Sequence, residues 1–217
     1  MYKTVVFDLD GTLLNTLTDL ADAGNRLCRK YGWPTHERQA YRYFVGNGIP
    51  KLVERLAPAD QRTPAVLEAA LADFKRDYGQ HLRDTTAPYP GIPEMLAKLK
   101  ANGVQLAVFS NKADALAKEV VKDYFGTQYF TIVRGQMTGV APKPAAEGTN
   151  ALLQALHADP ASTLYVGDSN VDVETAHNAN LPCCGAVWGF RTREELNAAG
   201  AEYLAENSDE LYDAIMK

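Results

Sequence analysis

The chain has 217 residues, of which 46% are hydrophobic and 23% are charged, and its formal net charge is −5. This length suits one substantial domain, or one domain with a smaller insert, and the composition is that of an ordinary globular protein rather than a disordered or fibrous one. The acidic balance argues against a general nucleic-acid binder, and no apolar run approaches the ~20 residues that span a bilayer, so we expect neither nucleic acid nor membrane as a partner.

Five short apolar runs predict buried strands, which alternate with helical patterns along the chain. In chain order, the expected strands are 4–7 (TVVF), 104–109 (VQLAVF), 129–133 (YFTIV), 163–167 (TLYVG) and 183–187 (CCGAV). The expected helices among them lie near 91–102, 111–125, 145–157 and 169–180. Strands that alternate with helices imply parallel pairing through right-handed crossovers, so the predicted fold class is α/β, with a doubly wound parallel sheet.

Residues 15–84 break this rhythm, because they contain several helix patterns and no convincing strand. The helix patterns lie at about 15–31, 36–44, 48–57 and 63–83, with turn signals between them. The alternation resumes at TTAPYPG, whose prolines and glycine suit a crossing of the chain. We therefore predict a core formed by residues 1–14 and 85–217, with a helical insert of residues 15–84 after the first strand.

The N-terminus and the cysteines bear on location and redox chemistry. MYKTVVFDLD has one lysine and only a short apolar stretch before charge returns, which does not fit a signal peptide, so a cytoplasmic location is expected for a bacterial protein. Cys28, Cys183 and Cys184 are an odd number without C-x-x-C spacing. A redox pair or metal site at 183–184 is one interpretation. We favour the other, in which the cysteines are small buried hydrophobic residues.

Polar side chains follow the predicted strands at their carboxyl ends, where ligands bind in an open parallel sheet. Lys143 lies in the PKP segment before the helix that precedes the fourth strand. The others are Asp8, Asp10, Gly11 and Thr12 after the first strand, Ser110, Asn111 and Lys112 after the second, and Asp168, Ser169, Asn170 and Asp172 after the fourth. Each alone has a plainer interpretation as a solvated turn, a helix N-cap or a surface lysine. Because four distant segments deliver them to one sheet edge, we interpret them together as a functional site.

This set of side chains supplies what phosphoryl transfer to a carboxylate requires. A nucleophilic aspartate, Asp8, can form an aspartyl-phosphate that splits hydrolysis into two easier displacements. Mg²⁺ prefers one or two carboxylates with phosphate oxygens and water, which Asp8 and Asp168 would supply. Asp10, two residues along the same loop, can protonate the leaving oxygen and later activate water.

The remaining polar groups would hold the phosphate. Lys143 would add fixed positive charge, while the Ser110 hydroxyl and the backbone N–H groups near Gly11 would bind phosphoryl oxygens. The full set of candidate phosphate-binding residues is Gly11, Thr12, Ser110, Asn111 and Lys143.

At these motifs the sequence resembles the haloacid dehalogenase superfamily over its whole length. DLDGTL (8–13) resembles the first motif of that family, Ser110 with Asn111 the second, Lys143 the third and GDSNVD (167–172) the fourth. The resemblance implies a Rossmann-like core, with a helical cap domain inserted after the first motif.

The resemblance also implies a role for each acidic residue. Asp8 is the expected nucleophile and Asp10 the expected general acid and base. Mg²⁺ is expected to bind Asp8, the backbone carbonyl of Asp10, and Asp168. Ser169 and Asp172 are expected to support the metal from the surrounding shell, with Asp172 forming hydrogen bonds around the metal or Lys143.

Within the superfamily, the nearest resemblance is to phosphoglycolate phosphatases. It rests on VGNGIPKLVERL (45–56), PYPG (88–91) and VWGFR (187–191). This implies a small phosphate ester as substrate, with 2-phosphoglycolate as the best candidate. Asn15 stands where the family usually has Asp, and Asn180 stands where it usually has Gly. PKPAAEG also lacks a second proline that often follows the lysine. None of these departures removes the expected chemistry.

The cap is expected to recognise the rest of the substrate. Gly46 and Gly48 predict a tight turn between two cap helices, with Asn47 between them. A substrate carboxylate needs a cationic donor, for which Lys51, Arg42 and Arg191 are the candidates. An exposed, solvated cation is the alternative interpretation of each.

Two other functions remain open at this point. A sugar-phosphate mutase of the same superfamily would need a cap loop that cycles a bisphosphate, which VGNGIPK does not resemble. A non-catalytic regulator that binds a phosphorylated metabolite is the second alternative, and the complete set of acidic residues argues against it. A dehalogenase is disfavoured, because Asp10 would have no use there. Either a monomer or a homodimer is compatible with the sequence.

Overall fold

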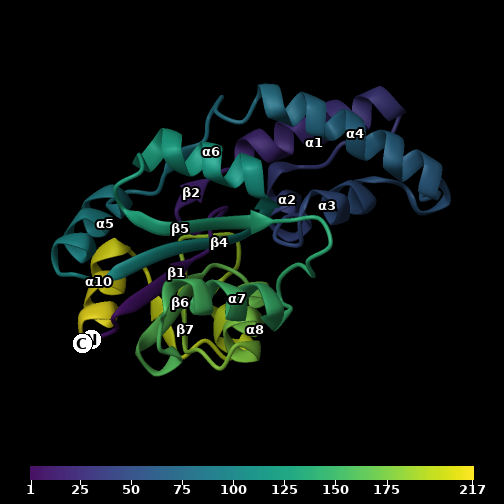
Figure 1. Cartoon of the computed structure of the whole chain (residues 1–217). Helices are drawn as coiled ribbons and strands as arrows, with labels where there is room; N and C mark the ends of the chain where they lie inside the picture. The colour runs from purple at the N-terminus through teal and green to yellow at the C-terminus, as the bar shows by residue number, and fades with distance from the viewer. The chain divides into compact units, whose positions relative to one another are not determined.

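A computed structural model of the chain describes residues 1–217, which form two compact units (Figure 1). The larger unit comprises Met1–Leu14 and Pro88–Lys217, and the smaller one comprises Asn15–Ala87. None of the helices combines the length and the apolar character that crossing a membrane would require.

A six-stranded parallel sheet forms the centre of the larger unit, in the order β5-β4-β1-β6-β7-β8. Its strands are β1 (Thr4–Phe7), β4 (Gln105–Ala113), β5 (Phe130–Gln136), β6 (Thr163–Gly167), β7 (Cys183–Ala186) and β8 (Tyr203–Ala205). Every residue of β1 is buried, because both faces of a parallel sheet are covered by helices. The predicted α/β fold class and its five strands are confirmed, and β8 is an additional strand at the edge.

Helices cover both faces of this sheet. They are α5 (Ile92–Ala101), α6 (Asp114–Phe125), α7 (Ala146–Leu156), α8 (Asn170–Asn178), α9 (Arg193–Ala199) and α10 (Ser208–Met216), with a 3₁₀ turn at Pro160–Ser162. Figure 1 shows α5 and α6 on one side of the sheet and α7 and α8 on the other. This follows from right-handed crossovers that run toward one edge of the sheet and then toward the other.

The strand order places a topological switch point beside β1. From β1 the chain proceeds to β4 and β5 on one side, and it then returns to β6 on the other side of β1. Phe7 at the end of β1 therefore pairs with Val108 of β4 and with Val166 of β6. In doubly wound sheets, the crevice outside the carboxyl ends of such strands is where ligands bind.

The core of the larger unit fixes these strand ends. Fully buried Val6 and Tyr165 project from β1 and β6 into a cluster with Leu152 of α7 and Val173 of α8. Full burial of an aliphatic side chain stabilises a fold by about 1.5–3 kcal/mol, so this cluster holds the sheet against α7 and α8. The three cysteines are free and buried, as predicted.

The smaller unit is helical, as expected for residues 15–84. Its helices are α1 (Leu17–Tyr31), α2 (Arg38–Phe44), α3 (Ile49–Leu56) and α4 (Pro64–Gln80), with a 3₁₀ turn at Ala59–Gln61. Helix α1 packs against the other three. Gly46 and Gly48, with φ of 107° and 82°, form the predicted turn between α2 and α3. Two short strands, β2 (Leu14–Asn15) and β3 (Ala87–Pro88), pair where the chain passes between the units.

A buried carboxylate ties the two ends of the smaller unit together. Asp19 in the first turn of α1 is 2% exposed. One of its oxygens accepts hydrogen bonds from the backbone N–H and the hydroxyl of Thr85, at 2.9 and 2.5 Å. The other oxygen accepts the same pair from Thr86, at 2.9 and 2.7 Å. The start of α1 and the return segment are therefore held by four hydrogen bonds to one side chain.

We expect Asp19→Ala to lower the free energy of unfolding by about 3 kcal/mol or more, because four hydrogen bonds to a charged group are lost, two of them from the buried Thr86. Urea denaturation followed by circular dichroism measures this change. Asp22→Ala, at an exposed position of the same helix, is the matched control and should change the stability by less than about 0.5 kcal/mol. An equally small effect of Asp19→Ala would contradict this role.

Candidate active site

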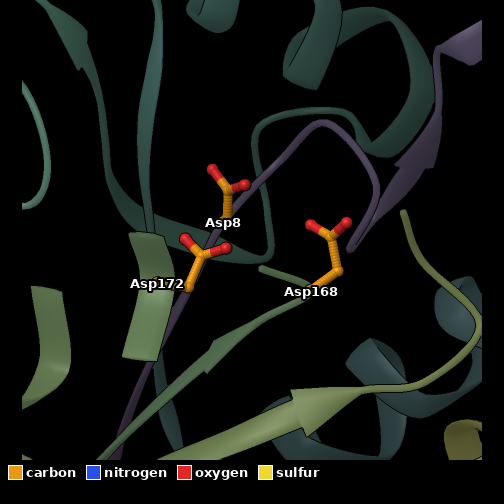
Figure 2. A group of neighbouring side chains, drawn as sticks. All are labelled: Asp8, Asp168 and Asp172. Atoms are coloured by element: carbon orange, nitrogen blue, oxygen red, sulfur yellow. The ribbon is translucent and has the colours of Figure 1, made fainter. Parts of the chain in front are cut away.

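Three buried carboxylates meet at the carboxyl ends of the central strands. Asp8 directly follows β1, Asp168 directly follows β6, and Asp172 lies in the first turn of α8. One oxygen from each lies within 4.8 Å of the others, and Figure 2 shows the three carboxylates turned the same way. Asp8 is 7% exposed and the other two are 1% exposed. The switch point of the sheet thus concentrates negative charge in a protected place.

A single ammonium group lies between two of these carboxylates. Lys143 Nζ is 2.8 Å from Asp8 Oδ1 and 2.7 Å from Asp172 Oδ1. It also donates to the Phe109 carbonyl and the Tyr165 hydroxyl, both at 3.3 Å. Lys143 is 3% exposed, and a buried charge of this kind is tolerated only when it is paired and hydrogen-bonded. The alternative interpretation of Lys143 as a surface lysine is therefore excluded, and its positive charge lies among the acidic residues.

Asn111 fixes the backbone of Lys143. Its side-chain oxygen accepts from the Lys143 backbone N–H at 2.9 Å, and its amide donates to the Lys143 carbonyl at 3.3 Å. The predicted phosphate ligand Asn111 therefore orients the loop that carries the ammonium. Ser110, 3% exposed, lies beside it in β4 and accepts the backbone N–H of Lys112 at 3.2 Å. The sequence did not indicate any of these three hydrogen bonds.

The loop after β1 encloses Asp168. The Thr12 hydroxyl donates to Asp168 Oδ1 at 3.1 Å, and the Phe190 backbone N–H donates to Oδ2 at 2.7 Å. Gly11 has φ of 97°, and a Cβ at this position would lie 2.3 Å from Asp168 Oδ2. The glycine of DLDGT is therefore required by both its backbone angle and this close approach. Thr12, a predicted phosphate ligand, directs its hydroxyl at Asp168.

Ser169 and Asp172 form a capping box at the start of α8. Asp172 Oδ2 accepts the Ser169 backbone N–H at 3.1 Å and its hydroxyl at 2.6 Å, while Oδ1 accepts Lys143. Both oxygens of Asp172 are therefore occupied by protein donors. This arrangement suits the predicted supporting role of the two residues around a metal.

The crowding of the carboxylates changes their proton affinity. Burial raises the pKa of Asp8 to about 7, against the lowering effect of Lys143, and Asp172 and Asp10 raise it further. Burial also raises the pKa of Asp168, with contributions from Asp172 and Asp8. The pKa of Lys143 is raised despite the opposing effect of burial, because Asp172 and Asp8 stabilise its charged form. Ionisation of all the acids would thus leave negative charge in excess.

These residues fit a divalent cation. The donors are hard carboxylate oxygens, which are the ligands that Mg²⁺ and Ca²⁺ take. Two of the three carboxylates have raised pKa values from burial and mutual repulsion, and a divalent ion would relieve both. Asp8 and Asp168, at the ends of the adjacent strands β1 and β6, are the predicted ligands, and Asp172 is shared between Lys143 and Ser169. That Asp8 and Asp168 hold the ion stays a prediction.

Asp10 forms an ion pair with a second lysine, Lys112. Lys112 Nζ lies 3.1 Å from Asp10 Oδ1 and 3.4 Å from Oδ2. The two aspartates of FDLDGT therefore have different surroundings, as their separate predicted roles require. Lys112 follows Ser110 and Asn111 at the end of a buried run, and that placement was the only sequence signal for it.

The cap candidates lie in the smaller unit. Lys51 Nζ forms an ion pair with Glu54 Oε1 at 2.7 Å, and Asn47 Oδ1 accepts from Arg55 at 2.9 Å. Arg42 lies in α2 and is half-buried. Arg191 belongs to the larger unit, is 7% exposed and donates its backbone N–H to the Asp168 carbonyl at 3.3 Å. Their roles in substrate recognition stay predictions.

Comparison with known proteins gives a consistent assignment. A sequence model of the haloacid dehalogenase-like hydrolase family matches residues 5–186. The chain is 31% identical to a phosphoglycolate phosphatase from Chromobacterium violaceum over 214 residues, which are 97% of this chain and 95% of that protein. It is also 31% identical to a phosphoglycolate phosphatase from Thiobacillus denitrificans over 191 residues, 87% and 84% of the two chains.

A solved structure agrees with this assignment. A protein from Lactobacillus delbrueckii, itself assigned as a phosphoglycolate phosphatase, superposes with a TM-score of 0.93 at 28% identity, covering 99% of this chain and 98% of its own. The family match extends over most of the chain, including all four site motifs. The chain belongs to the haloacid dehalogenase-like hydrolase family.

Proposed function

We propose that this protein is a Mg²⁺-dependent phosphatase that hydrolyses a small phosphate monoester through an aspartyl-phosphate on Asp8. The observation that carries the proposal is the buried Asp8 carboxylate, 2.8 Å from Lys143 and grouped with Asp168 at the switch point of the sheet. The relatives that match nearly the whole chain bear the name phosphoglycolate phosphatase, which is a phosphoric monoester hydrolase. They make 2-phosphoglycolate the first substrate to test.

The proposed reaction has two displacements at phosphorus. In the first, an Asp8 oxygen attacks the phosphorus, the bond to the ester oxygen breaks, and Asp10 gives its proton to that oxygen. In the second, water attacks the phosphorus of the aspartyl-phosphate, gives a proton to Asp10 and releases the Asp8 carboxylate with inorganic phosphate. Asp8 and Asp10 thus end the cycle in their starting states.

Fixed charges make the approach of two anions possible. Lys143, held in place by Asn111 and Asp172, stays an ammonium throughout and faces Asp8. Mg²⁺, when bound by Asp8, Asp168 and the backbone carbonyl of Asp10, would offset the remaining repulsion between carboxylate and phosphate. The Ser110 hydroxyl and the backbone N–H groups around Gly11 are the proposed donors to phosphoryl oxygens.

The helical unit, as a cap, is proposed to recognise the leaving group. The Gly46–Gly48 turn and the cations Lys51 and Arg42 are the candidates. A panel of phosphate esters assayed with Mg²⁺ tests both the reaction and this preference. It should include 2-phosphoglycolate, a sugar phosphate, a nucleotide and p-nitrophenyl phosphate. Absence of turnover on all of them would support a binding protein instead.

Removal of the nucleophile should abolish turnover. We expect Asp8→Asn to lower kcat by at least about a thousandfold, because the amide cannot form the aspartyl-phosphate. The assay is phosphate release from p-nitrophenyl phosphate with Mg²⁺, with circular dichroism to confirm the fold. Asp213→Asn, an exposed aspartate of α10 in the same unit, is the control and should retain full activity. More than a few per cent residual activity in Asp8→Asn would rule out the covalent route.

Metal binding should strengthen as the pH rises through the pKa of Asp8. Without an ion, the folded state keeps a proton on Asp8 up to about pH 7, whereas the unfolded chain loses it near 3.8. This contribution to stability is complete below about pH 4 and is lost as the pH rises through about 7. A bound cation requires the ionised carboxylate. The stability that the cation contributes therefore increases, rather than decreases, as the pH rises through the pKa of Asp8.

We therefore expect the increase in Tm caused by Mg²⁺ to be larger at about pH 8 than at about pH 6. If binding releases one proton, the apparent affinity for Mg²⁺ should rise by roughly tenfold per pH unit below the pKa of the carboxylate. Differential scanning fluorimetry at fixed Mg²⁺ measures it. Asp168→Asn should greatly reduce the increase at both pH values. An equal or larger increase at the lower pH would contradict the assignment of Asp8 as a ligand.

The substrate carboxylate provides a test of the cap. Lys51→Ala should raise KM for 2-phosphoglycolate by about tenfold or more, because a charge-assisted hydrogen bond is lost, and should leave KM for p-nitrophenyl phosphate almost unchanged. Lys75→Ala, at an exposed position of α4, is the control. Equal changes for both substrates would show that Lys51 does not bind the carboxylate.

A further inference from the structure

Lys112 is a buried cation in the larger unit for which the family motifs and the proposed reaction have no assigned use. Its side chain is 3% exposed, whereas that of its partner Asp10 is 15% exposed. Burial of an ammonium costs several kcal/mol unless it is well paired, so a lysine here requires a reason. Its Nζ contacts both oxygens of Asp10, at 3.1 and 3.4 Å.

The backbone of Lys112 is fixed by its surroundings. It lies in β4, which continues past the strand end that carries Ser110 and pairs again with β5 at Ala113 and Gln136. The Lys112 N–H donates to the Ser110 hydroxyl oxygen at 3.2 Å. Directly after β4, Asp114 at the start of α6 accepts the Gly135 backbone N–H of β5 at 3.0 Å. The ammonium is therefore presented to Asp10 from an irregular part of β4 that lies between two residues paired with β5, Phe109 and Ala113.

The unequal contacts to Asp10 suit a residue that must donate a proton. A carboxylic acid has one oxygen that carries the proton and one that can only accept. Lys112 Nζ contacts Oδ1 at 3.1 Å and Oδ2 at 3.4 Å, so Oδ1 is held more closely and Oδ2 is the oxygen on which we place the proton. An ammonium that contacts the carboxyl group in this way also restricts its rotation, and small misplacements of a catalytic group lower the rate strongly.

We propose that Lys112 is a positioning residue for the reaction, whose ammonium holds the Asp10 carboxyl group with Oδ2 toward the leaving oxygen. This inference rests on the proposed function of Asp10. Lys112 keeps its three protons throughout. The proton moves from Asp10 Oδ2 to the ester oxygen as the bond from phosphorus to that oxygen breaks, and it is replaced from water in the second displacement.

The leaving group provides the decisive measurement. An alkoxide is a poor leaving group that needs the proton of Asp10, whereas p-nitrophenolate needs it little. The value of kcat/KM reports the steps up to departure of the leaving group, and we would measure it for 2-phosphoglycolate, ethyl phosphate and p-nitrophenyl phosphate. Asp10→Asn should lower it for the two alkyl esters at least about tenfold more than for the aryl ester.

Lys112→Met should reproduce this pattern, with a loss for both alkyl esters at least about fivefold greater than for p-nitrophenyl phosphate. In the Asp10→Asn background, Lys112→Met should change kcat/KM by less than about twofold further, because the carboxyl group that Lys112 positions is gone. Lys118→Met is the matched control. Lys118 also pairs with an aspartate, Asp114, at 2.7 Å, but its side chain is 57% exposed, and its loss should leave all three values unchanged.

Other outcomes would overturn the inference. Equal losses for the three esters would mean that Lys112 supports the site only in general, and a loss confined to 2-phosphoglycolate would mean that it binds the substrate carboxylate. Wild-type values in Lys112→Met would also reject it. If Lys112→Met does not fold, Lys112→Gln, which is neutral but keeps a donor, is tested by the same criteria. Absence of leaving-group dependence in Asp10→Asn would instead reject the proposed role of Asp10.

Discussion

The ammonium of Lys143 between Asp8 and Asp172 is the interaction on which the site depends. Three carboxylates crowded at one sheet edge repel one another, and burial makes each charge costly. The ammonium offsets part of this cost, and the remaining negative charge suits a divalent cation. The fold tolerates such a cluster because β1 and β6, buried on both faces, hold two of the carboxylates on adjacent strand ends.

Several polar residues that were predicted to bind phosphate or to surround the metal form hydrogen bonds within this cluster. Asn111 binds both the backbone N–H and the carbonyl of Lys143. Thr12 donates to Asp168, and Ser169 caps α8 together with Asp172. Each of these contacts fixes a charged group before a substrate arrives. Such preorganisation favours catalysis, because donors and charges need not rearrange as the transition state forms.

The two aspartates of one short loop are separated by their partners. Asp8 contacts Lys143 beside the other acidic residues, and Asp10 contacts Lys112 of β4. The chain can turn sharply directly after Asp10 because Gly11 adopts a positive φ and lies against Asp168. Two chemically identical side chains thus acquire environments suited to a nucleophile and to a proton carrier.

The sequence by itself determined the fold class, five strands of the sheet and the helical character of residues 15–84, because buried strands and amphipathic helices have distinct apolar periods. It also predicted that the polar residues after β1, β4 and β6 meet, since parallel strands end at one edge. It missed β8, α9 and α10, which are short elements near the C-terminus. Their apolar runs are too brief to indicate a period.

Only the tertiary structure decided which side chain each polar residue contacts. That Asn111 holds Lys143, that Asp172 is shared between Lys143 and Ser169, and that Lys112 is buried against Asp10 depends on register and on loop paths. These contacts join residues separated by up to about a hundred positions in the chain, and no local pattern encodes them. The sequence therefore specified the chemistry available at the sheet edge, and the fold specified its geometry.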